Sequence, residues 1–354
     1  MPIVEYAPGL FEDLRQMVSR LARTVNLAHR PFVDYYYATR SWCKLYLYLS
    51  DSGSVLGTLG RDLTRFEYKS REITIRLTSN WYSLEKGVGG QLAKFSIQTN
   101  SNSIGLMFTG SRDARKILHH YGYLFMPGVR RYVLNSPYQP NARDDWVRGA
   151  AKSIARRLAQ ENPIPSFASR ISPDVVARIS VREEQSYSQD LLPGRSAFTF
   201  RFAPTIEYLS WRYNLSLSFV RYRLFRVVDR GTNIGYVIIN ESPEQLIVAQ
   251  CDGEDATALA HGVLLSVLEV GRHDQKGRAV RLTSCHPEMR EVFERFGFRP
   301  QWGGDLPFAF GTRPPEFDPF SDTSSWLINL DWGDNGLQPP FLDEAVEKPA
   351  GRPT

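Results

Sequence analysis

The sequence predicts an α/β (α+β) protein of two tandem domains, each with a mixed, mostly antiparallel twisted sheet flanked by helices. The chain has 354 residues, about twice the length of a typical domain. Strand-like and helix-like stretches recur in the same order in two blocks that lie about 175 positions apart. Each block closes on a helix followed by an aromatic residue, a glycine and a second aromatic residue. These observations together predict an internal duplication.

Each block opens with a hairpin. Residues 44–49 and 222–228 are strand-like, and turns containing Asp and Gly lead from them into second strands. Three residue pairs of the two hairpins fall 178 positions apart: Asp51 and Asp229, Gly53 and Gly231, and Gly57 and Gly235.

A strand, a helix and a short strand follow in each block. In the first block we expect a half-buried strand at 72–78, a glycine-rich turn, a helix at 91–99 and a strand at 104–108. In the second block the counterparts are a strand at 245–250, a helix at 256–272 and a strand at 279–282.

The closing segments match at an offset of 175, with residues 111–123 over 286–298. Gly122 and Gly297 are identical in this match and predict a glycine exit after each helix. Many helices end in this way, so the shared order of all elements is the stronger indication of duplication. We expect an N-terminal domain at 1–137, a connecting helix at 138–165, a C-terminal domain at 166–334 and a proline-rich tail at 335–354.

Composition excludes several protein classes. Apolar residues make up 42% and charged residues 23%, as in soluble globular chains. No apolar run reaches the roughly 18 residues of a membrane helix, and no apolar signal core precedes residue 27, so we expect a cytoplasmic protein without membrane contact. Cys43, Cys251 and Cys285 share no metal-ligand spacing, which predicts reduced thiols and no metal.

The net charge of +5 conceals an asymmetry between the two halves. Residues 1–160 contain 23 Lys and Arg against 12 Asp and Glu, a net charge of +11, and the remaining residues carry −6. The first half is therefore expected to meet an anion, which could be nucleic acid, a membrane surface or a phosphate-rich cofactor. A solvated basic face without a ligand is the alternative.

The segment NWYSLEKGVGGQL, residues 80–92, contains the most informative motif. A strand end leads through Gly87, Gly89 and Gly90 into an amphipathic helix. Glycines let a ligand approach the backbone closely, and a helix N-terminus presents unpaired N–H groups and partial positive charge. The pattern predicts a pyrophosphate cradle, with a purely structural turn as the alternative. It matches neither the P-loop nor the dinucleotide fingerprint.

These residues resemble the GCN5-related N-acetyltransferases (GNATs), in which a Gln/Arg-x-x-Gly-x-Gly/Ala loop holds the pyrophosphate of acetyl-CoA. Residues 84–89 fit both glycine positions, although Leu84 replaces Gln/Arg. The resemblance implies acetyl-CoA as co-substrate, no metal, and transfer of the acetyl group to a primary amine. The cofactor contacts that it implies are Asn80, Trp81, Tyr82, Ser83, Lys86, Gly87, Val88, Gly89, Gly90, Gln91 and Ser111.

The general acid implied by the resemblance is altered in this chain. Leu118 occupies the position where the family usually has a tyrosine that protonates the leaving thiolate. Tyr121 is the nearest tyrosine on the apolar side of the helix and is our candidate for the acid, with a core aromatic as the alternative. Glu72 and Asp62 are candidates for the base that deprotonates the amine.

The acceptor is expected between the first sheet and the second block. Residues 26–40 correspond to the variable acceptor segment of the family, which makes His29, Arg30 and Tyr36 candidate substrate contacts. The equally weighted alternative is a helix and loop that only cover the hydrophobic core. Asp331 and Asp334 in a late acidic loop are candidates for attracting a cationic amine.

The second copy is predicted to be degenerate. Aligned at the offset of 175, Gly262 and Val263 match Gly87 and Val88, but Leu264 replaces Gly89 and is expected to obstruct the cofactor. Two other functions stay open: a non-catalytic CoA-sensing or scaffold protein, and an aminoacyl-tRNA-dependent transferase. Nucleic acid is the less favoured partner, because the basic residues form no stripe interleaved with aromatic residues.

Overall fold

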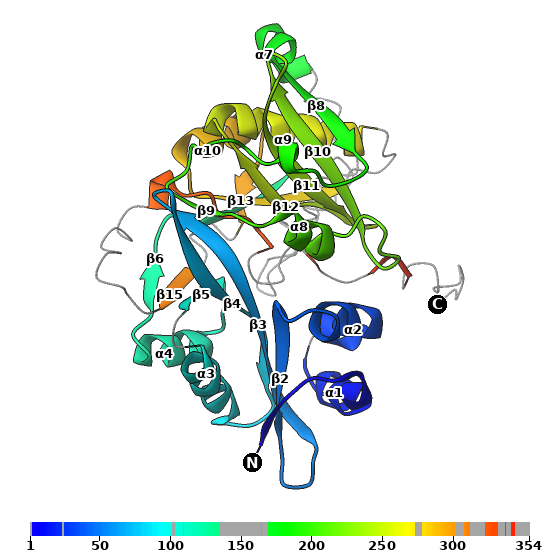
Figure 1. The fold of residues 1–354 in the computed structure, drawn as a ribbon, viewed down its shortest axis with the longest axis vertical. Coiled ribbons are helices and arrows are strands. Elements are labelled where there is room, and N and C mark those ends of the chain that lie inside the picture. The colour runs from blue at the N-terminus through cyan, green and yellow to red at the C-terminus, as the bar shows by residue number, and fades with distance from the viewer. Residues whose placement is uncertain are drawn as a thin grey trace, which may run out of the picture.

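A computed structural model describes residues 2–22, 25–100, 103–108, 110–134, 164, 169–272, 278–301, 308–311, 323–331, 337 and 341–343. It contains two β-sheets with helices on their faces (Figure 1). Almost all of the predicted connecting helix at 138–165 and most of the predicted tail at 335–354 lie outside the described residues.

The first block contains all the elements that the sequence predicted, together with two N-terminal helices. In chain order they are β1 (Ile3–Glu5), η1 (Pro8–Leu10), α1 (Phe11–Ser19), η2 (Asn26–Ala28), α2 (Arg30–Ala38), β2 (Cys43–Leu49), β3 (Val55–Tyr68), β4 (Arg71–Ser83), α3 (Val88–Thr99), β5 (Ile104–Phe108), α4 (Arg112–His120), β6 (Leu124–Met126) and β7 (Arg130–Leu134).

The second block repeats the order of hairpin, strand, helix, strand and helix, but differs before its hairpin. Its elements are α7 (Pro173–Arg178), β8 (Ile179–Glu184), η3 (Gln189–Leu191), β9 (Phe200–Phe202), α8 (Ile206–Arg212), β10 (Arg221–Asp229), β11 (Thr232–Glu241), β12 (Gln245–Gly253), α9 (Ala256–Gly271), β13 (Ala279–Ser284), α10 (Pro287–Arg295), β14 (Arg299–Pro300), β15 (Phe308–Gly311) and η5 (Thr323–Ser325). The predicted α/β class with two mixed, mostly antiparallel sheets is confirmed.

The predicted helix exits have the same backbone geometry in both copies. Gly122 and Gly297 take φ of +77° and +90°, a region that favours glycine. The next residue then donates back into the helix, with Tyr123 N–H bonded to Leu118 O at 3.0 Å and Phe298 N–H to Phe293 O at 3.1 Å.

Each sheet receives strands from the other block: β9 and β15 of the second block join the first sheet, and β7 of the first block joins the second. The first sheet has the order β1-β2-β3-β4-β5-β15-β6, with β9 also paired to β3, and the second has the order β14-β7-β13-β12-β11-β10-β8. Strand β7 therefore leaves the first block and pairs with β13, while β15 returns from the second block and pairs with β5 and β6. The sequence blocks 1–137 and 166–334 thus do not coincide with the two sheets.

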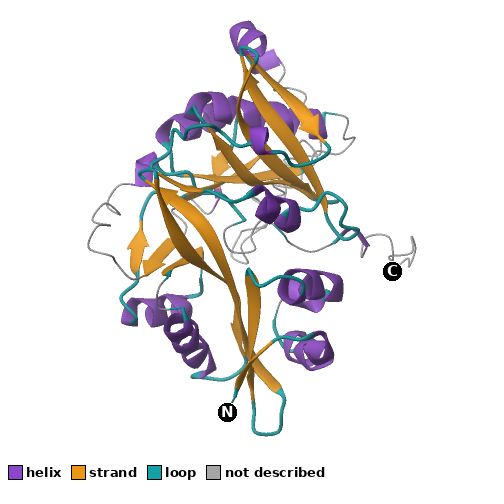
Figure 2. Cartoon of the chain, viewed as in Figure 1, coloured by secondary structure: helices purple, strands orange, loops and turns teal. Residues whose placement is uncertain are grey.

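One large core joins the two halves. Helices α1 and α2 lie on one side of the first sheet and α3 and α4 on the other (Figure 2). The α1/α2 face shares a hydrophobic cluster with the second sheet, which includes Leu77, Tyr208 and Ile238. A second cluster packs α9 and α10 on the far face of the second sheet. Among the described residues, no helix is long and apolar enough to cross a membrane.

An ion cluster also crosses between the halves. Arg201 of β9 bonds Glu67 of β3 at 3.1 Å and pairs with the buried Asp252 of β12. Burial raises the pKa of Asp252 to about 6, and the attraction of Arg201 opposes that rise.

Candidate active site

A bulge interrupts the pairing of β4 near its C-terminal end. Thr58 of β3 lies opposite Tyr82 and Gly60 lies opposite Ser79, so Leu59 faces two residues, Asn80 and Trp81. Asn80 takes a φ of +43°, in the left-handed region that asparagine tolerates. An extra residue of this kind is left out of the strand ladder.

Side chains on the α2 side hold this strained residue. The Asn80 side-chain amide donates to the Tyr37 hydroxyl at 2.7 Å, and the Thr58 hydroxyl donates to the Asn80 carbonyl at 2.8 Å. Tyr37 and Asn80 are both buried. The bulge is therefore a fixed feature of the fold.

Strands β4 and β5 separate where the bulge begins. They pair in parallel only from Ile75 with Ile104 to Thr78 with Met107. Strand β4 then continues to Ser83 without β5 beside it. The inner edge of β4 beyond Thr78 therefore does not face β5.

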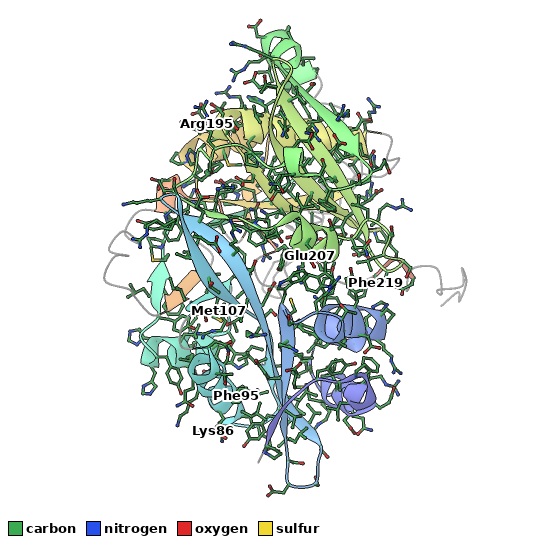
Figure 3. The ribbon with its side chains drawn as sticks, in the orientation of Figure 1. Lys86, Phe95, Met107, Arg195, Glu207 and Phe219 are labelled. Atoms are coloured by element: carbon green, nitrogen blue, oxygen red, sulfur yellow. The ribbon has the colours of Figure 1, made fainter. Side chains whose placement is uncertain are left out.

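The glycine turn begins α3 directly after this strand end. Gly87 is the N-cap, with a φ of +92°, and no side chain caps the helix. The first helical bond runs from Gln91 N–H to Gly87 O at 3.1 Å, so the N–H groups of residues 88–90 precede the helical ladder. No acidic residue lies in the first turn, and Lys86 is exposed beside it (Figure 3). This helix end can receive an anion.

Trp81 connects the bulge to the turn. Its indole N–H donates to the Gly89 carbonyl at 3.2 Å. A Cβ at Gly89 would lie 3.4 Å from both the Trp81 indole nitrogen and the Ser83 hydroxyl. The indole also packs against a small cluster of Met107, Leu118 and Tyr123. The structure thus brings Trp81, Ser83 and residues 87–90 to one end of the sheet.

Tyr121 lies against the same cluster as Trp81. It is the C-cap residue of α4 and is half-buried, whereas Leu118 is 3% exposed beneath it. This position fits both roles considered for Tyr121, a packed core aromatic and a hydroxyl near the point where β4 and β5 separate.

Four other predicted residues lie away from this end or serve the fold. Glu72 was predicted as a base, but it lies near the start of β4, exposed and paired with Arg65 at 3.0 Å. Eight residues separate it from Asn80, or about 26 Å along a strand, so Glu72 cannot reach the bulge. Ser111 caps α4 by accepting from Ala114 N–H at 3.1 Å. The Tyr82 side chain packs into the core between the halves, and Gln91 accepts from the Tyr48 hydroxyl at 3.2 Å.

The predicted acceptor residues are engaged within the protein. His29 is 8% exposed, accepts from Phe32 N–H and bonds Asp343 at 2.8 Å. Arg30 is exposed and pairs with Asp34.

Tyr36 is 1% exposed, and its hydroxyl donates to the Arg212 carbonyl at 2.8 Å. Burial raises the pKa of that hydroxyl. The tyrosine that does reach the bulge is Tyr37, which the sequence analysis missed. Tyr35, Tyr36 and Tyr37 are consecutive in the sequence, and their order alone does not show which of them contacts Asn80.

The second copy differs from the predicted alignment. Its helix α9 begins at Ala256, so Gly262 and Leu264 lie inside a buried helix rather than in a turn. The structural counterpart of Gly87 is Asp255, whose carboxylate accepts from Ala258 N–H at 2.7 Å. The predicted obstruction by Leu264 is therefore wrong. A capping carboxylate occupies the helix end instead, and its charge repels an anion.

The chain itself fills the gap between β12 and β13. These strands pair only over residues 245–247 with 279–281, and residues 326–331 then run between them. The Asn329 side chain bonds Cys251 N–H at 3.0 Å and Cys251 O at 3.1 Å, and Asp331 N–H donates to Ala249 O at 3.2 Å. On the other strand, Thr283 donates to Ile328 O at 3.0 Å. We call residues 326–331 the plug segment.

Comparisons with solved structures agree with this architecture. Saccharomyces cerevisiae N-myristoyltransferase with bound myristoyl-CoA aligns over 92% of this chain and 85% of its own, at 9% identity and a TM-score of 0.55. A tandem GNAT protein from the clavulanic acid biosynthesis pathway aligns over 88% of this chain and 99% of its own, at 14% identity and a TM-score of 0.51. The chain has the tandem GNAT fold.

A third structure with this GNAT fold is a probable N-acyltransferase from Enterococcus faecalis. It aligns over 87% of this chain and 71% of its own, at 8% identity and a TM-score of 0.51. No protein-family model matches the sequence, and comparison with curated proteins finds no match either.

Proposed function

We propose that the protein is an N-acetyltransferase that moves the acetyl group of acetyl-CoA to a primary amine at its N-terminal copy. The observation that carries this proposal is the bulge at Asn80, which lies between diverging strands and is followed directly by the uncapped N-terminus of α3. The similar N-myristoyltransferase structure contains bound myristoyl-CoA, which supports an acyl-CoA as co-substrate.

Each part of the site has a role in this proposal. The N–H groups of residues 88–90 and the Lys86 ammonium bind the pyrophosphate. The edge of β4 from Asn80 to Ser83, which does not pair with β5, is proposed to bind the pantetheine arm, and a bulge N–H polarises the thioester carbonyl. Holding both reactants in line contributes about 7–11 kcal/mol to lowering the barrier. The Tyr121 hydroxyl is the proposed proton donor to the leaving thiolate.

Gly90 offers a direct test of the pyrophosphate cradle. A Cβ at Gly90 would meet no atom within 4 Å. Gly90→Glu places a carboxylate at the helix N-terminus, which should stabilise the ligand-free protein by about 0.3–1 kcal/mol. The same charge repels a diphosphate, so the thermal stabilisation by acetyl-CoA should fall to near zero. Differential scanning fluorimetry with and without acetyl-CoA measures both effects.

Gly90→Gln is the matched control for this experiment. It has the same shape and a similar helix propensity but no charge, so it should keep most of the acetyl-CoA stabilisation, which is about 2.7 kcal/mol at a hundredfold excess over Kd. Equal ligand-induced shifts in the wild type and both variants would mean that acetyl-CoA does not bind at this helix end.

The second copy should bind no acetyl-CoA, because the plug segment and Asp255 occupy its groove and helix end. Isothermal titration calorimetry should therefore give one acetyl-CoA per chain, and two would contradict the assignment. Release of CoA thiol with a panel of primary amines tests catalysis. Binding without turnover of any amine would favour the CoA-sensing alternative.

A further inference from the structure

A cluster of charged and hydroxyl side chains is buried where the two halves meet. It consists of Asp62 of β3, Tyr208 and Arg212 of α8, and Asp331 of the plug segment. Helix α8, which also carries the labelled Glu207, lies at the junction with the first half (Figure 3). Three of the four residues come from the second block, so the second copy builds most of this cluster.

The cluster contains two carboxylates and one guanidinium. Asp331 accepts from Arg212 Nε at 3.1 Å and is 3% exposed. Asp62 is 7% exposed and accepts from the Tyr208 hydroxyl at 2.5 Å. Oδ1 of Asp62 and Oδ1 of Asp331 are both buried, and neither has a hydrogen-bond partner among the described residues. The two carboxylates differ in their bonded partner, because Asp331 pairs with the Arg212 guanidinium and Asp62 with the Tyr208 hydroxyl. Asp62 is therefore the carboxylate of the two that is bonded to a neutral group, and it can take a proton without breaking an ion pair.

Asp62 lies on the same face of β3 as the groups that hold the bulge. Two residues before it, a Cβ at Gly60 would lie 3.0 Å from the Tyr37 hydroxyl and closer still to the Ser79 hydroxyl. Residues two apart on one strand face are separated by about 7 Å. The Tyr37 hydroxyl contacts the Asn80 side chain at 2.7 Å. Tyr37 thus lies over position 60 of β3, next to Asp62 on the same strand face.

We propose that Asp62 receives the proton of the acceptor amine through the Tyr37 hydroxyl, and that Tyr208, Arg212 and Asp331 of the second copy hold Asp62 in place. This inference rests on the proposed acetyl transfer. Asp62 does not contact the reacting nitrogen in this proposal. It acts through the Tyr37 hydroxyl and is therefore a positioning residue for proton transfer. It also gives the second copy, which has no free groove of its own, a part in the reaction.

The proposed step balances in protons and bonds. The acceptor ammonium passes one proton through Tyr37 to the Asp62 carboxylate, and the neutral nitrogen attacks the thioester carbonyl carbon. A C–N bond forms as the C–S bond breaks. A second proton passes from the nitrogen to the leaving sulfur through Tyr121, which yields the amide and CoA thiol. Asp62 then returns its proton to solvent.

The surroundings of Asp62 suit it to this task. Burial raises the pKa of the carboxyl above its ordinary value, and Asp331 adds to the rise. Arg212 and the hydrogen bonds from Tyr208 and from the Cys43 thiol oppose it. A carboxylate raised toward neutral pH is a more effective base than an exposed one. Its ionisation should give kcat/KM an acidic limb.

Asp62→Asn tests the proposal with two acceptors of similar shape. One is the most active primary amine of the panel, protonated at neutral pH, and the other is the corresponding hydrazine, which is largely neutral there. With the amine, kcat/KM should fall by roughly 10²–10⁴-fold and the acidic limb should disappear. With the hydrazine the loss should be less than about tenfold. The KM for acetyl-CoA should not change.

Two further variants separate this role from a structural one. Tyr208→Phe keeps Asp62 but removes a hydrogen bond that lowers its pKa, so the acidic limb should move to higher pH. Glu72→Gln, at the far end of β4, should leave the profile as in the wild type. An equal loss with both acceptors, or an unchanged acidic limb in Asp62→Asn, would overturn the proposal.

Infrared difference spectroscopy tests the same group without any acceptor. The difference between the wild type and Asp62→Asn should contain a protonated carboxyl band that titrates and that changes on addition of acetyl-CoA. Asp252, whose pKa burial raises to about 6, contributes to both proteins and cancels in this difference. Absence of such a band would overturn the inference while acetyl-CoA still stabilises the protein. If acetyl-CoA stabilises neither protein, the proposed function fails instead, and the inference with it.

Discussion

Tyr132→Ala should lower the free energy of unfolding by about 3–5 kcal/mol, the range for removing a large buried aromatic side chain. Tyr132 is 0% exposed and packs against Phe293. Its hydroxyl donates to Glu294 at 2.7 Å and accepts from Arg290 at 3.0 Å. Because Tyr132 lies on β7, this change in the first sequence block weakens the second sheet.

The exchange of β7 and β15 also predicts how the variant unfolds. Each sheet contains a strand from the other block, so both halves should unfold together in one transition. Denaturant titrations followed by tryptophan fluorescence and by circular dichroism should coincide in the wild type and in Tyr132→Ala.

Tyr132→Phe serves as the control, since it keeps the ring and removes only the hydroxyl bonds. It should cost about 1.5–3 kcal/mol, because both partners of the hydroxyl are charged. Two separate transitions, with only one affected by the substitution, would show that the halves are independent and would contradict the exchange.

Asn329→Ala should cost about 2–5 kcal/mol. The Asn329 side chain satisfies the N–H and the carbonyl of Cys251, both in the buried groove of the second copy. Each buried backbone group left without a partner costs about 1–3 kcal/mol. Urea unfolding measures the loss, and binding of one acetyl-CoA to the first copy should survive below the transition.

Asn214→Ala is the comparison for Asn329→Ala. The Asn214 side chain also makes two hydrogen bonds, to the Tyr35 hydroxyl and from Ser216 N–H, but it is only half-buried. Water can replace these bonds, so the loss should stay below about 1 kcal/mol. Equal losses at the two positions would mean that the plug segment does not lie in the groove as described.

Much of the fold could be predicted from short stretches of sequence. The two hairpins, the helices α3, α4, α9 and α10, and the glycine exits at Gly122 and Gly297 lie where the sequence predicted them. The glycine turn at Gly87 also begins a helix as predicted. These features depend on residues within a few positions of one another, where turn chemistry and hydrophobic spacing act directly.

Two predictions were wrong. A constant offset placed Gly262 over Gly87, yet α9 starts at Ala256, because β12 is shorter than β4 and the connection that follows it is shorter as well. Glu72 and the bulge lie on one continuous strand, and the eight residues between Glu72 and Asn80 then place the carboxylate too far away. A constant offset between two copies does not register changes in element length, and the distance along a strand follows only once the extent of the strand is known.

The sequence by itself determined the duplication, the local elements and the bare glycine turn, because each follows from contacts between neighbours in the chain. Only the tertiary structure decided which sheet receives β7 and β15, that Tyr37 rather than Tyr36 reaches Asn80, and that residues 326–331 fill the second groove. Those outcomes depend on backbone pairing and burial between segments far apart in the sequence. The hydrophobic pattern of a strand fits many possible partner strands equally well, so the pattern does not select one of them.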